Sequence, residues 1–374
     1  MRSDNETDAI SKIMTNSILD IMQTYDHENV ILCQEKGLGV RAIIAIHDTT
    51  LGPAAGGMRM LPYASEQDAI DDALRLARGM TYKAAVAGVN HGGGKCIVIG
   101  DPRHDKNEAL FCLLGRFIER LGGHYITGED VGTNAFDMDI IGRETRYVFA
   151  LPSGEEVSDF TAIGVMQGIR ASLQQVYGSA DLQGCSVAVQ GIGSVGGKLV
   201  KRLIEAGAVV SIADIDQAAV EQVARDFPEV SVLPPQEVHT HPVDVYCPCA
   251  LGAILSSRTI PELQCKIVCG AANNQLADEQ CSDLLMQQGI VYAPDFVVNA
   301  GGLIAYADSY TPEGFQRQRA LTNVERIYHT LESIFALSGQ QSIATAHAAD
   351  LIAEQRIAAM RQAKSAMAGL SHIR

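Results

Sequence analysis

The hydrophobic and polar positions of the first 150 residues alternate between strand and helix patterns. Two short apolar runs flank a glycine-containing turn, which predicts paired strands at 30–33 and 41–47. Apolar residues at helical spacing predict three helices, over 9–22, 65–78 and 107–121. Ser65 can cap the second of these helices. A further strand is expected at 96–99, directly after three consecutive glycines.

From residue 151 onward, predicted helices and strands alternate regularly. A helix over 161–177 is followed by strands at 187–189 and 209–214, a pattern typical of a parallel sheet with helices on both faces. A chain of 374 residues is long enough for two domains. We place an α/β substrate-binding and oligomerisation domain at 1–150 and a doubly wound, Rossmann-type domain at 151–344. The helical tail 345–374 is expected to pack back on the first domain.

Composition and charge narrow the class of protein. The net charge of −15 argues against a nucleic-acid surface, and no apolar run has the ~20 residues that a membrane span requires. The acidic N-terminal segment lacks the apolar core of a signal peptide, so we expect a cytoplasmic protein that handles small molecules. Of the nine cysteines only Cys247 and Cys249 are close together, and no second pair lies at zinc-ligand spacing, so no metal is expected.

A glycine-rich turn between a predicted strand and helix indicates a dinucleotide site. In the run from Val187 to Lys198, Gly191 permits the tight turn, Gly193 admits the pyrophosphate and Gly196 allows close packing of helix and strand. Ser194 and Val195 open the helix, whose free amides attract phosphate. Asp214, at the end of the next strand, is placed to accept from a ribose 2′-hydroxyl and to repel a 2′-phosphate, which favours NAD over NADP.

Two lysines in small-residue surroundings suggest the chemistry. Lys83 lies in an apolar run after Met80, and Lys95 follows the three glycines, which would let another molecule approach the backbone. Two ammonium groups in one cleft would disfavour each other's charge, and burial would add to the effect, so one pKa should fall. Such a lysine can be a general base, while the other holds a carboxylate. The acid pair Glu129-Asp130, in a glycine-flanked turn, would supply the counter-charge.

Several motifs in one order resemble the glutamate/leucine/phenylalanine/valine dehydrogenase superfamily, most closely its leucine, phenylalanine and tryptophan dehydrogenases. These motifs are Leu51-Gly-Pro-Ala-Ala-Gly-Gly-Met-Arg-Met60, Met80-Thr-Tyr-Lys83, Gly-Gly-Gly-Lys95, Gly128-Glu-Asp-Val-Gly132, Cys249-Ala-Leu-Gly252, Ala272-Asn-Asn-Gln275 and Val298-Asn-Ala-Gly-Gly302. The resemblance implies an L-amino-acid dehydrogenase with a hinged cleft between two domains, assembled as a homo-oligomer. It would oxidise its substrate to a 2-oxo acid and ammonium, using NAD.

The same resemblance implies a role for each matching residue. Lys95 would activate water and Asp130 would exchange protons with the reacting nitrogen, while Lys83 would bind the substrate α-carboxylate. The other substrate-site residues would be Gly56, Gly57, Met80, Asn274, Ala55, Gly128, Leu303 and Tyr306. Besides the glycine turn, Ser194, Val195 and Asp214, the cofactor site would include Ala250, Asn273, Asn299 and Thr161.

The substrate side chain is predicted to be apolar, but its size stays open. Glutamate-specific relatives carry a lysine where this chain has Ala55, and burying a second carboxylate without that charge would be unfavourable. Ala55 and Gly128 are smaller than their counterparts in leucine-type relatives, which suggests room for an aromatic substrate. Leu303 and Tyr306 are larger than the valines expected there, and they could refill the space or stack on an aromatic ring. The sequence is therefore compatible with a branched-chain and with an aromatic substrate.

Two other functions would also use such a cofactor fold. A non-catalytic NAD-binding regulatory protein would need none of Lys83, Lys95 and Asp130, and all three are present. A 2-hydroxy-acid dehydrogenase would need a histidine base with an acidic partner, and His91 is the nearest candidate. Activity with amino acids distinguishes these possibilities.

Overall fold

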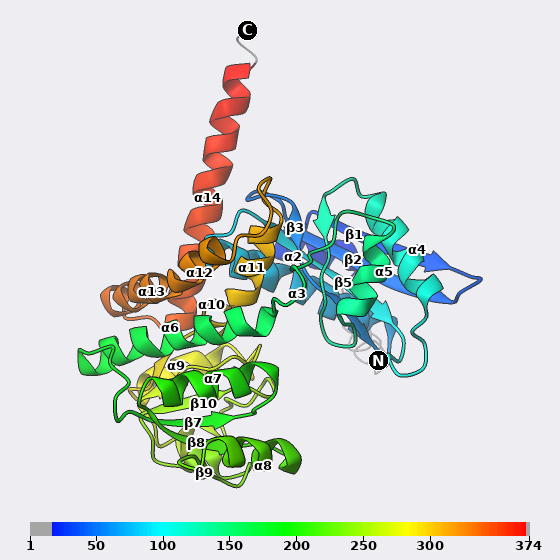
Figure 1. Cartoon of the computed structure of the whole chain (residues 1–374). Helices are drawn as coiled ribbons and strands as arrows, with labels where there is room; N and C mark the ends of the chain where they lie inside the picture. The colour runs from blue at the N-terminus through cyan, green and yellow to red at the C-terminus, as the bar shows by residue number, and fades with distance from the viewer. Residues whose placement is uncertain (1–16, 372–374) are drawn as a thin grey trace, which may run out of the picture. The chain divides into compact units, whose positions relative to one another are not determined.

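The computed structural model describes residues 17–371 and folds them into two compact units (Figure 1). The first unit comprises the described residues up to Thr81 together with Gly92–Val148. The second comprises Tyr82–His91 and the chain from Phe149 onward. The prediction that the first domain binds substrate and mediates oligomerisation is not decided by this division and stays a prediction.

The first unit is built on a mixed six-stranded sheet. Its strand order is β1-β2-β5-β3-β6, with β4 also paired to β5. The strands are β1 (Asn29–Glu35), β2 (Val40–Asp48), β3 (Ala54–Ala55), β4 (Met58–Leu61), β5 (Gly92–Ile99) and β6 (Tyr125–Ile126). The helices are α2 (Ile18–Tyr25), the greater part of α3 (Glu66–Val86), α4 (Glu108–Glu119) and α5 (Ala135–Gly142). The predicted pairing of the first two strands is confirmed, because β1 and β2 run antiparallel with Val30 opposite Ala45.

Helix α3 packs on this sheet through small side chains. Ala69, Ala73 and Ala77 are fully buried, and their spacing of four places them on one helix face. They contact a core that includes Ile43 and Ile97 from the central strands. Alanine lets a helix approach a sheet closely, so α3 is held firmly beside β5.

The second unit contains a six-stranded sheet in which every pair is parallel. The order β12-β11-β10-β7-β8-β9, read from the other edge, is 3-2-1-4-5-6 in chain order, which confirms the predicted Rossmann-type fold. Its strands are β7 (Ser186–Gln190), β8 (Val209–Ala213), β9 (Ser231–Val232), β10 (Val245–Pro248), β11 (Ile267–Val268) and β12 (Val291–Tyr292). The order reverses between β7 and β10, where ligands of such sheets bind.

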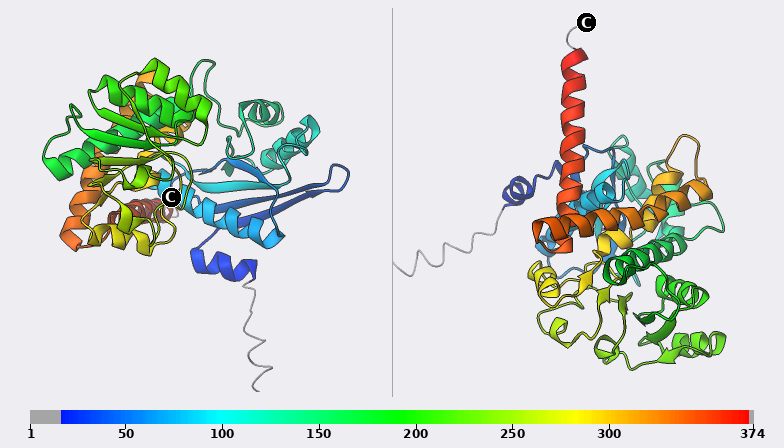
Figure 2. Two further views of the ribbon diagram at one scale, coloured as in Figure 1. Left: turned by 90° about the horizontal axis from the view of Figure 1, so that it is seen from below. Right: turned by 90° about the vertical axis from the view of Figure 1, so that its left-hand side faces the viewer.

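Helices cover both faces of this sheet (Figure 2). The helices of the second unit are α6 (Val157–Tyr177), α7 (Ser194–Glu205), α8 (Gln217–Asp226), α9 (Gln280–Gln287), α10 (Asp295–Val298), α11 (Gly301–Ser309), α12 (Arg317–Glu325), α13 (Ile327–Gln341) and α14 (Thr345–Ser371), with short 3-10 helices at Val238–Thr240 and Ile260–Glu262. Within the described part of the chain, none of the helices is both long and apolar enough to cross a bilayer.

Several predicted boundaries are wrong or incomplete. The helix predicted at 65–78 continues to Val86, so Lys83 lies on its last turn. The three glycines before Lys95 belong to strand β5, because each finds a partner strand despite its low strand propensity. Of the helix predicted at 9–22, only the part from Ile18 onward lies in helix α2, and residues 9–16 lie outside the described residues.

The long helix α14 packs within the second unit against α9, α13 and β12. Arg356 also anchors it to the end of α3, where the guanidinium donates to the carbonyl oxygens of Ala84 (3.1 Å), Ala85 (2.9 Å) and Val89 (2.9 Å). The last carbonyls of a helix lack partners within it, so Arg356 acts as a cap for α3. The C-terminal part of α14 extends away from the rest of its unit (Figure 2, right).

Replacing this cap should destabilise the second unit. We expect Arg356→Met, which keeps the aliphatic stem but removes all four hydrogen bonds to residues 84–90, to cost about 2 kcal/mol. That loss should lower the melting temperature by roughly 4–8 °C in scanning calorimetry. Lys364→Met, at an exposed position on the same helix, is the control and should leave the melting temperature unchanged. Equal melting temperatures for both variants would contradict this role.

Candidate active site

The glycine turn after β7 has the geometry that a dinucleotide pyrophosphate requires. Gly191 has a φ of +95°, and a Cβ there would lie 2.7 Å from the Cβ of Ala250. A Cβ on Gly196 would lie 1.9 Å from the carbonyl oxygen of Gly191, so helix and turn touch directly. In contrast, a Cβ on Gly193 would meet nothing within 4 Å. Space is therefore left at the start of α7, where free amides face outward.

Asp214 follows β8 and closes this turn from the other side. One carboxylate oxygen accepts from the backbone N–H of Ile192 at 2.7 Å, and the other accepts from the N–H of Asp216 at 2.9 Å. The carboxylate is therefore fixed at the carboxyl end of the sheet, next to the glycine turn. Ser194 and Val195 form the first turn of α7, as the sequence predicts.

Lys83 belongs to a polar chain inside the second unit. Its ammonium donates to Oδ1 of Asn299 at 2.7 Å, and Nδ2 of Asn299 donates to Oδ1 of Asn273 at 2.8 Å. Asn274, next along the chain, has a φ of +52°, in the left-handed region that asparagine adopts more readily than most non-glycine residues. The structure thus brings together residues that the sequence assigned to substrate (Lys83, Asn274) and to cofactor (Asn273, Asn299).

Two glycines place α11 directly against α6. A Cβ on Gly301 would lie 2.0 Å from the carbonyl oxygen of Phe160, and one on Gly302 would lie 3.1 Å from Oγ1 of Thr161. Thr161 donates its hydroxyl proton to the carbonyl of Val157 at 3.1 Å. Close packing explains why this motif carries two glycines.

Leu303 and Tyr306 stand on the next turns of α11, and their surroundings are aromatic. The ring of Tyr306 stacks on Phe149 with centroids 5.5 Å apart and planes 21° apart. Phe149 also meets His91 and Tyr310 edge-on, at 5.6 and 5.9 Å. Leu303 is buried beside them on the same helix. This contact joins Tyr306 to another side chain of the protein, so the two uses predicted for Tyr306, refilling the pocket or stacking on a substrate ring, stay predictions.

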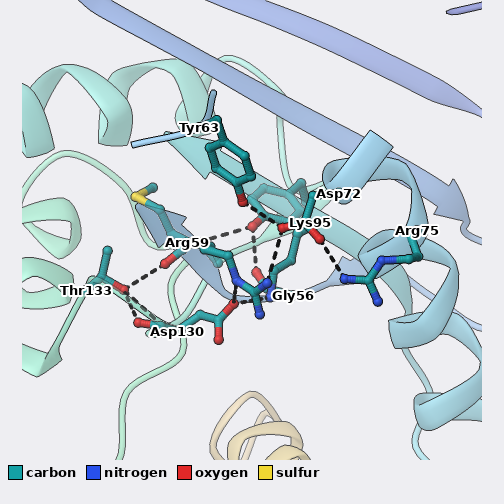
Figure 3. Close-up of polar contacts among 11 residues, drawn as sticks. Gly56, Arg59, Tyr63, Asp72, Arg75, Lys95, Asp130 and Thr133 are labelled. Atoms are coloured by element: carbon teal, nitrogen blue, oxygen red, sulfur yellow. Dashed lines mark hydrogen bonds and ion pairs between the residues drawn. The ribbon is translucent and has the colours of Figure 1, made fainter. Parts of the chain in front are cut away.

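In the first unit, Lys95 and Asp130 form a buried ion pair (Figure 3). Nζ of Lys95 lies 2.5 Å from Oδ2 of Asp130, and the same oxygen accepts from Nε of Arg59 at 3.0 Å. The Lys95 side chain is only 6% exposed and that of Asp130 19%. Thr133 holds the Asp130 turn in place, since its hydroxyl accepts from the N–H of Asp130 and donates to the carbonyl of Met58.

Burial and neighbouring charges shift the pKa values of both Lys95 and Asp130. Burial lowers the pKa of Lys95, the charge of Asp130 opposes that effect, and the charge of Arg59 adds to it. Although burial alone would raise it, the pKa of Asp130 falls to about 2, because Lys95 and Arg59 stabilise the carboxylate. A lowered lysine pKa was predicted from a second lysine nearby. The cation that acts on Lys95 inside this unit is Arg59, which the sequence reasoning missed.

The glycines before Lys95 serve internal packing, while the prediction that they also admit another molecule stays a prediction. A Cβ on Gly92 would lie 1.9 Å from the carbonyl oxygen of Asp48, and one on Gly93 would lie 2.2 Å from the backbone nitrogen of Thr81. On Gly94 it would lie 2.8 Å from the ring of Tyr125. The space beside each of the three glycines is thus filled by the first unit itself, which fixes Lys95 on a rigid strand.

The remaining substrate-site candidates of the first unit lie next to this strand. Ala55, on β3, pairs with Gly93 and is fully buried. A Cβ on Gly56 would lie 1.7 Å from the carbonyl oxygen of Gly94, and one on Gly57 2.8 Å from the Cβ of Asp130. Gly128 accepts at its carbonyl from the N–H of Met58, and Met80 lies on α3. Gly56 and Gly57 thus lie directly against the strand of Lys95 and the turn of Asp130.

Lys83 and Lys95 fall in different units. Their predicted meeting in one cleft therefore stays a prediction. Among the described residues, no group of three or more histidine, cysteine, aspartate or glutamate side chains could hold a metal ion. Arg59 could have been noticed in the sequence, since it stands only two residues after the Gly56-Gly57 pair on an alternating strand.

Both units match family models over nearly their whole length. Residues 27–147 match the Glu/Leu/Phe/Val dehydrogenase dimerisation domain, and residues 155–369 match the Glutamate/Leucine/Phenylalanine/Valine dehydrogenase model. The chain belongs to this dehydrogenase family. The resemblance read from the motifs is thereby confirmed, and so is the enzyme class, an amino-acid dehydrogenase that works with a nicotinamide cofactor.

Characterised members of this family are similar throughout. A leucine dehydrogenase of Geobacillus stearothermophilus is 49% identical over 348 residues, which cover 92% of this chain and 94% of the relative. A valine dehydrogenase of Streptomyces virginiae is 46% identical over a region that covers 90% of this chain and 95% of the relative. The crystal structure of L-tryptophan dehydrogenase from Nostoc punctiforme is 42% identical, with a TM-score of 0.82 over 92% of this chain and 99% of that one.

The two glycines of the dehydrogenase turn should respond differently to the same substitution. Gly193→Ala has room in the protein, so we expect an unchanged melting temperature but at least tenfold weaker NADH binding, because the methyl group stands where the pyrophosphate must approach. Gly196→Ala collides with the carbonyl of Gly191 and should lower the melting temperature. Fluorescence titration with NADH and calorimetry measure both effects. Unaltered NADH affinity in Gly193→Ala would refute the assigned pyrophosphate position.

Proposed function

We propose that this protein catalyses the reversible, NAD-dependent oxidative deamination of an apolar L-amino acid to its 2-oxo acid and ammonium. The observation that carries the proposal is the buried Lys95–Asp130 pair, at 2.5 Å and with the lysine pKa lowered. A lysine whose pKa is lowered is better able to give up its proton and act as a general base, and a carboxylate beside it can exchange protons. Neither a regulatory protein nor a hydroxy-acid dehydrogenase needs this pair.

The residues present fit a dinucleotide. The open space at Gly193 and the amides at the start of α7 suit a pyrophosphate, and the fixed carboxylate of Asp214 suits a ribose 2′-hydroxyl. The same carboxylate would repel a 2′-phosphate, so we assign NAD in preference to NADP. Gly191, Ser194, Val195, Gly196, Ala250, Asn273, Asn299 and Thr161 complete the proposed cofactor site. A dinucleotide held by these residues would supply the acceptor for the hydride that leaves the substrate Cα.

The side chains of the protein then have separate tasks. Lys83, oriented by Asn299, binds the substrate α-carboxylate, and Asn274 orients the substrate. Lys95 removes a proton from the water that adds to the substrate iminium carbon. Asp130 exchanges protons with the substrate nitrogen, so that ammonium can leave. Positive charge near Lys95 also stabilises the anionic oxygen that develops on the substrate carbon.

The substrate side chain is apolar in this proposal, and two observations bear on its size. Ala55 and Gly128 are small and lie on the buried side of the first unit, which favours a large side chain. The stacking of Tyr306 on Phe149 fills space on α11 in the second unit, which favours a branched aliphatic one. Leucine and valine dehydrogenases are among the relatives, and so is a tryptophan dehydrogenase. We further propose a homo-oligomer, supported by the match of the first unit to a dimerisation model.

An amino-acid panel tests the activity and the substrate class together. The protein is incubated with NAD or NADP and with leucine, valine, phenylalanine, tryptophan, glutamate or 2-hydroxyisocaproate, and NAD(P)H is followed at 340 nm. We expect NADH to form with apolar amino acids, at least tenfold faster than with glutamate or with NADP. The ranking of branched-chain against aromatic substrates decides the open choice. Turnover of only the hydroxy acid, or of no substrate, would overturn the proposal.

Replacing the proposed base should remove turnover without removing cofactor binding. Lys95→Met keeps the length and burial of the side chain but has no amine, so we expect kcat to fall by at least about a thousandfold. NADH binding should be unchanged, because the proposed cofactor residues lie in the other unit. Stopped assays with high enzyme concentration measure the residual rate. Substantial turnover in this variant would show that Lys95 is not the base.

A further inference from the structure

A chain of alternating charges runs from Lys95 to the surface of the first unit (Figure 3). Asp130 contacts both Lys95 and Arg59, and Nη1 of Arg59 lies 3.1 Å from Oδ2 of Asp72. Asp72 in turn is 2.6 Å from Nη2 of Arg75, whose side chain is 56% exposed. The order of signs is therefore plus, minus, plus, minus, plus. The first four side chains are all less than one fifth exposed.

Arg59 is the central member, and its position on β4 requires a forked side chain. Its Nε donates to Asp130, while Nη1 donates to Asp72 on helix α3. A lysine offers one nitrogen on a flexible stem, so it could not hold both carboxylates in this fixed plane. The hydroxyl of Tyr63 donates to Asp72 at 2.6 Å and fixes that carboxylate as well.

The arrangement answers a chemical difficulty in the proposed mechanism. A lysine amine 2.5 Å from an ionised carboxylate is stabilised as an ammonium, and an ammonium cannot act as a base. Arg59 offers permanent positive charge to the same carboxylate oxygen, so that oxygen does not depend on Lys95 for its counter-charge. Asp72 has the opposite effect on Lys95, because its negative charge partly compensates the positive charge of Arg59.

Two further titratable side chains of the described first unit lie near Lys95 and are neutral. Cys96 on β5 and Tyr125 on β6 are fully buried, and burial raises the pKa of each far enough to keep it neutral. The Tyr125 hydroxyl donates to the carbonyl of Gly56 at 2.5 Å. On α3, Asp72 is the acid that acts on Lys95, and its pKa is lowered by Tyr63, Arg75 and Arg59. The charge balance at Lys95 is thus set by Asp130, Arg59 and Asp72.

We propose that Arg59 is a positioning residue that neutralises Asp130 so that Lys95 can work as an uncharged base, and that Asp72 moderates Arg59. This inference rests on the proposed amino-acid dehydrogenase function. It predicts that removing Arg59 and removing Asp72 shift the working pH of the enzyme in opposite directions. Loss of structural support alone would impair both variants in the same direction.

The test is the pH dependence of kcat/KM for wild type, Arg59→Gln, Asp72→Asn and the double variant, with the best amino acid of the panel. Arg116→Gln is the matched control, because Arg116 pairs with Glu144 elsewhere in the same unit. Arg59→Lys tests whether charge without the fork suffices. Circular dichroism and melting temperature establish that each variant is folded.

The acid limb of the profile reports the deprotonation of the base in the free enzyme. Without Arg59, Asp130 holds Lys95 more strongly as an ammonium, so the limb should move about one pH unit upward. Without Asp72, the limb should move downward by a smaller amount. The acid limb of the double variant should lie between those of the two single variants, and the limb of Arg116→Gln should match wild type. In Arg59→Lys the limb should lie close to its wild-type pH, although the maximal kcat/KM should be reduced.

Three outcomes would overturn the inference. The limb could stay in place in Arg59→Gln while only the plateau falls, both single variants could shift in the same direction, or Arg59→Lys could shift as far as Arg59→Gln. Failure of the proposed function looks different, since wild type itself would then form no NADH with any amino acid. Each folded variant therefore gives a decisive result.

Discussion

One oxygen of the Asp130 carboxylate accepts from both an ammonium and a guanidinium, and the architecture of the first unit is organised to permit this. Strand β5 supplies Lys95, strand β4 supplies Arg59, and the turn after β6 supplies Asp130. Two cations this close are favourable only because the carboxylate lies between them and Asp72 compensates the second. In the proposed mechanism this crowded arrangement has a chemical use, because burial and Arg59 lower the pKa of the Lys95 amine.

Close backbone packing makes the charge arrangement possible. The glycines of β5 bring Lys95 against β2, β3 and α3, and Gly56 lets β3 approach β5 at the same level. In the second unit, Gly191 and Gly196 do the same for the turn at the switch point of the parallel sheet, while Gly193 faces open space. Glycine therefore serves close internal packing at Gly56, Gly191 and Gly196, whereas at Gly193 it leaves the space that we propose for the pyrophosphate.

The sequence was most informative at positions where only one structure explains why a particular residue type is needed. The Gly191–Gly196 turn followed by Asp214 predicted the Rossmann fold, because few other structures need those residues at that spacing. Family motifs predicted Lys95, Asp130 and their chemistry. The position of Arg59 beside the Gly56-Gly57 pair could have drawn attention to it, but its ion pair with Asp72 depends on tertiary packing that no local pattern encodes. The end of α3 was misplaced for a similar reason, since its cap is Arg356, far along the chain.

The central claim is that the buried amine of Lys95 loses its proton more easily than an ordinary lysine. NMR titration of protein labelled with ¹³C at the lysine Cε, with the Lys95→Met spectrum as the assignment, measures this directly. We predict that one signal, missing from the variant, titrates well below the ~10.4 of an exposed lysine. If every lysine signal titrates together at the ordinary value, the account of Lys95 as a base poised by Asp130 and Arg59 is wrong.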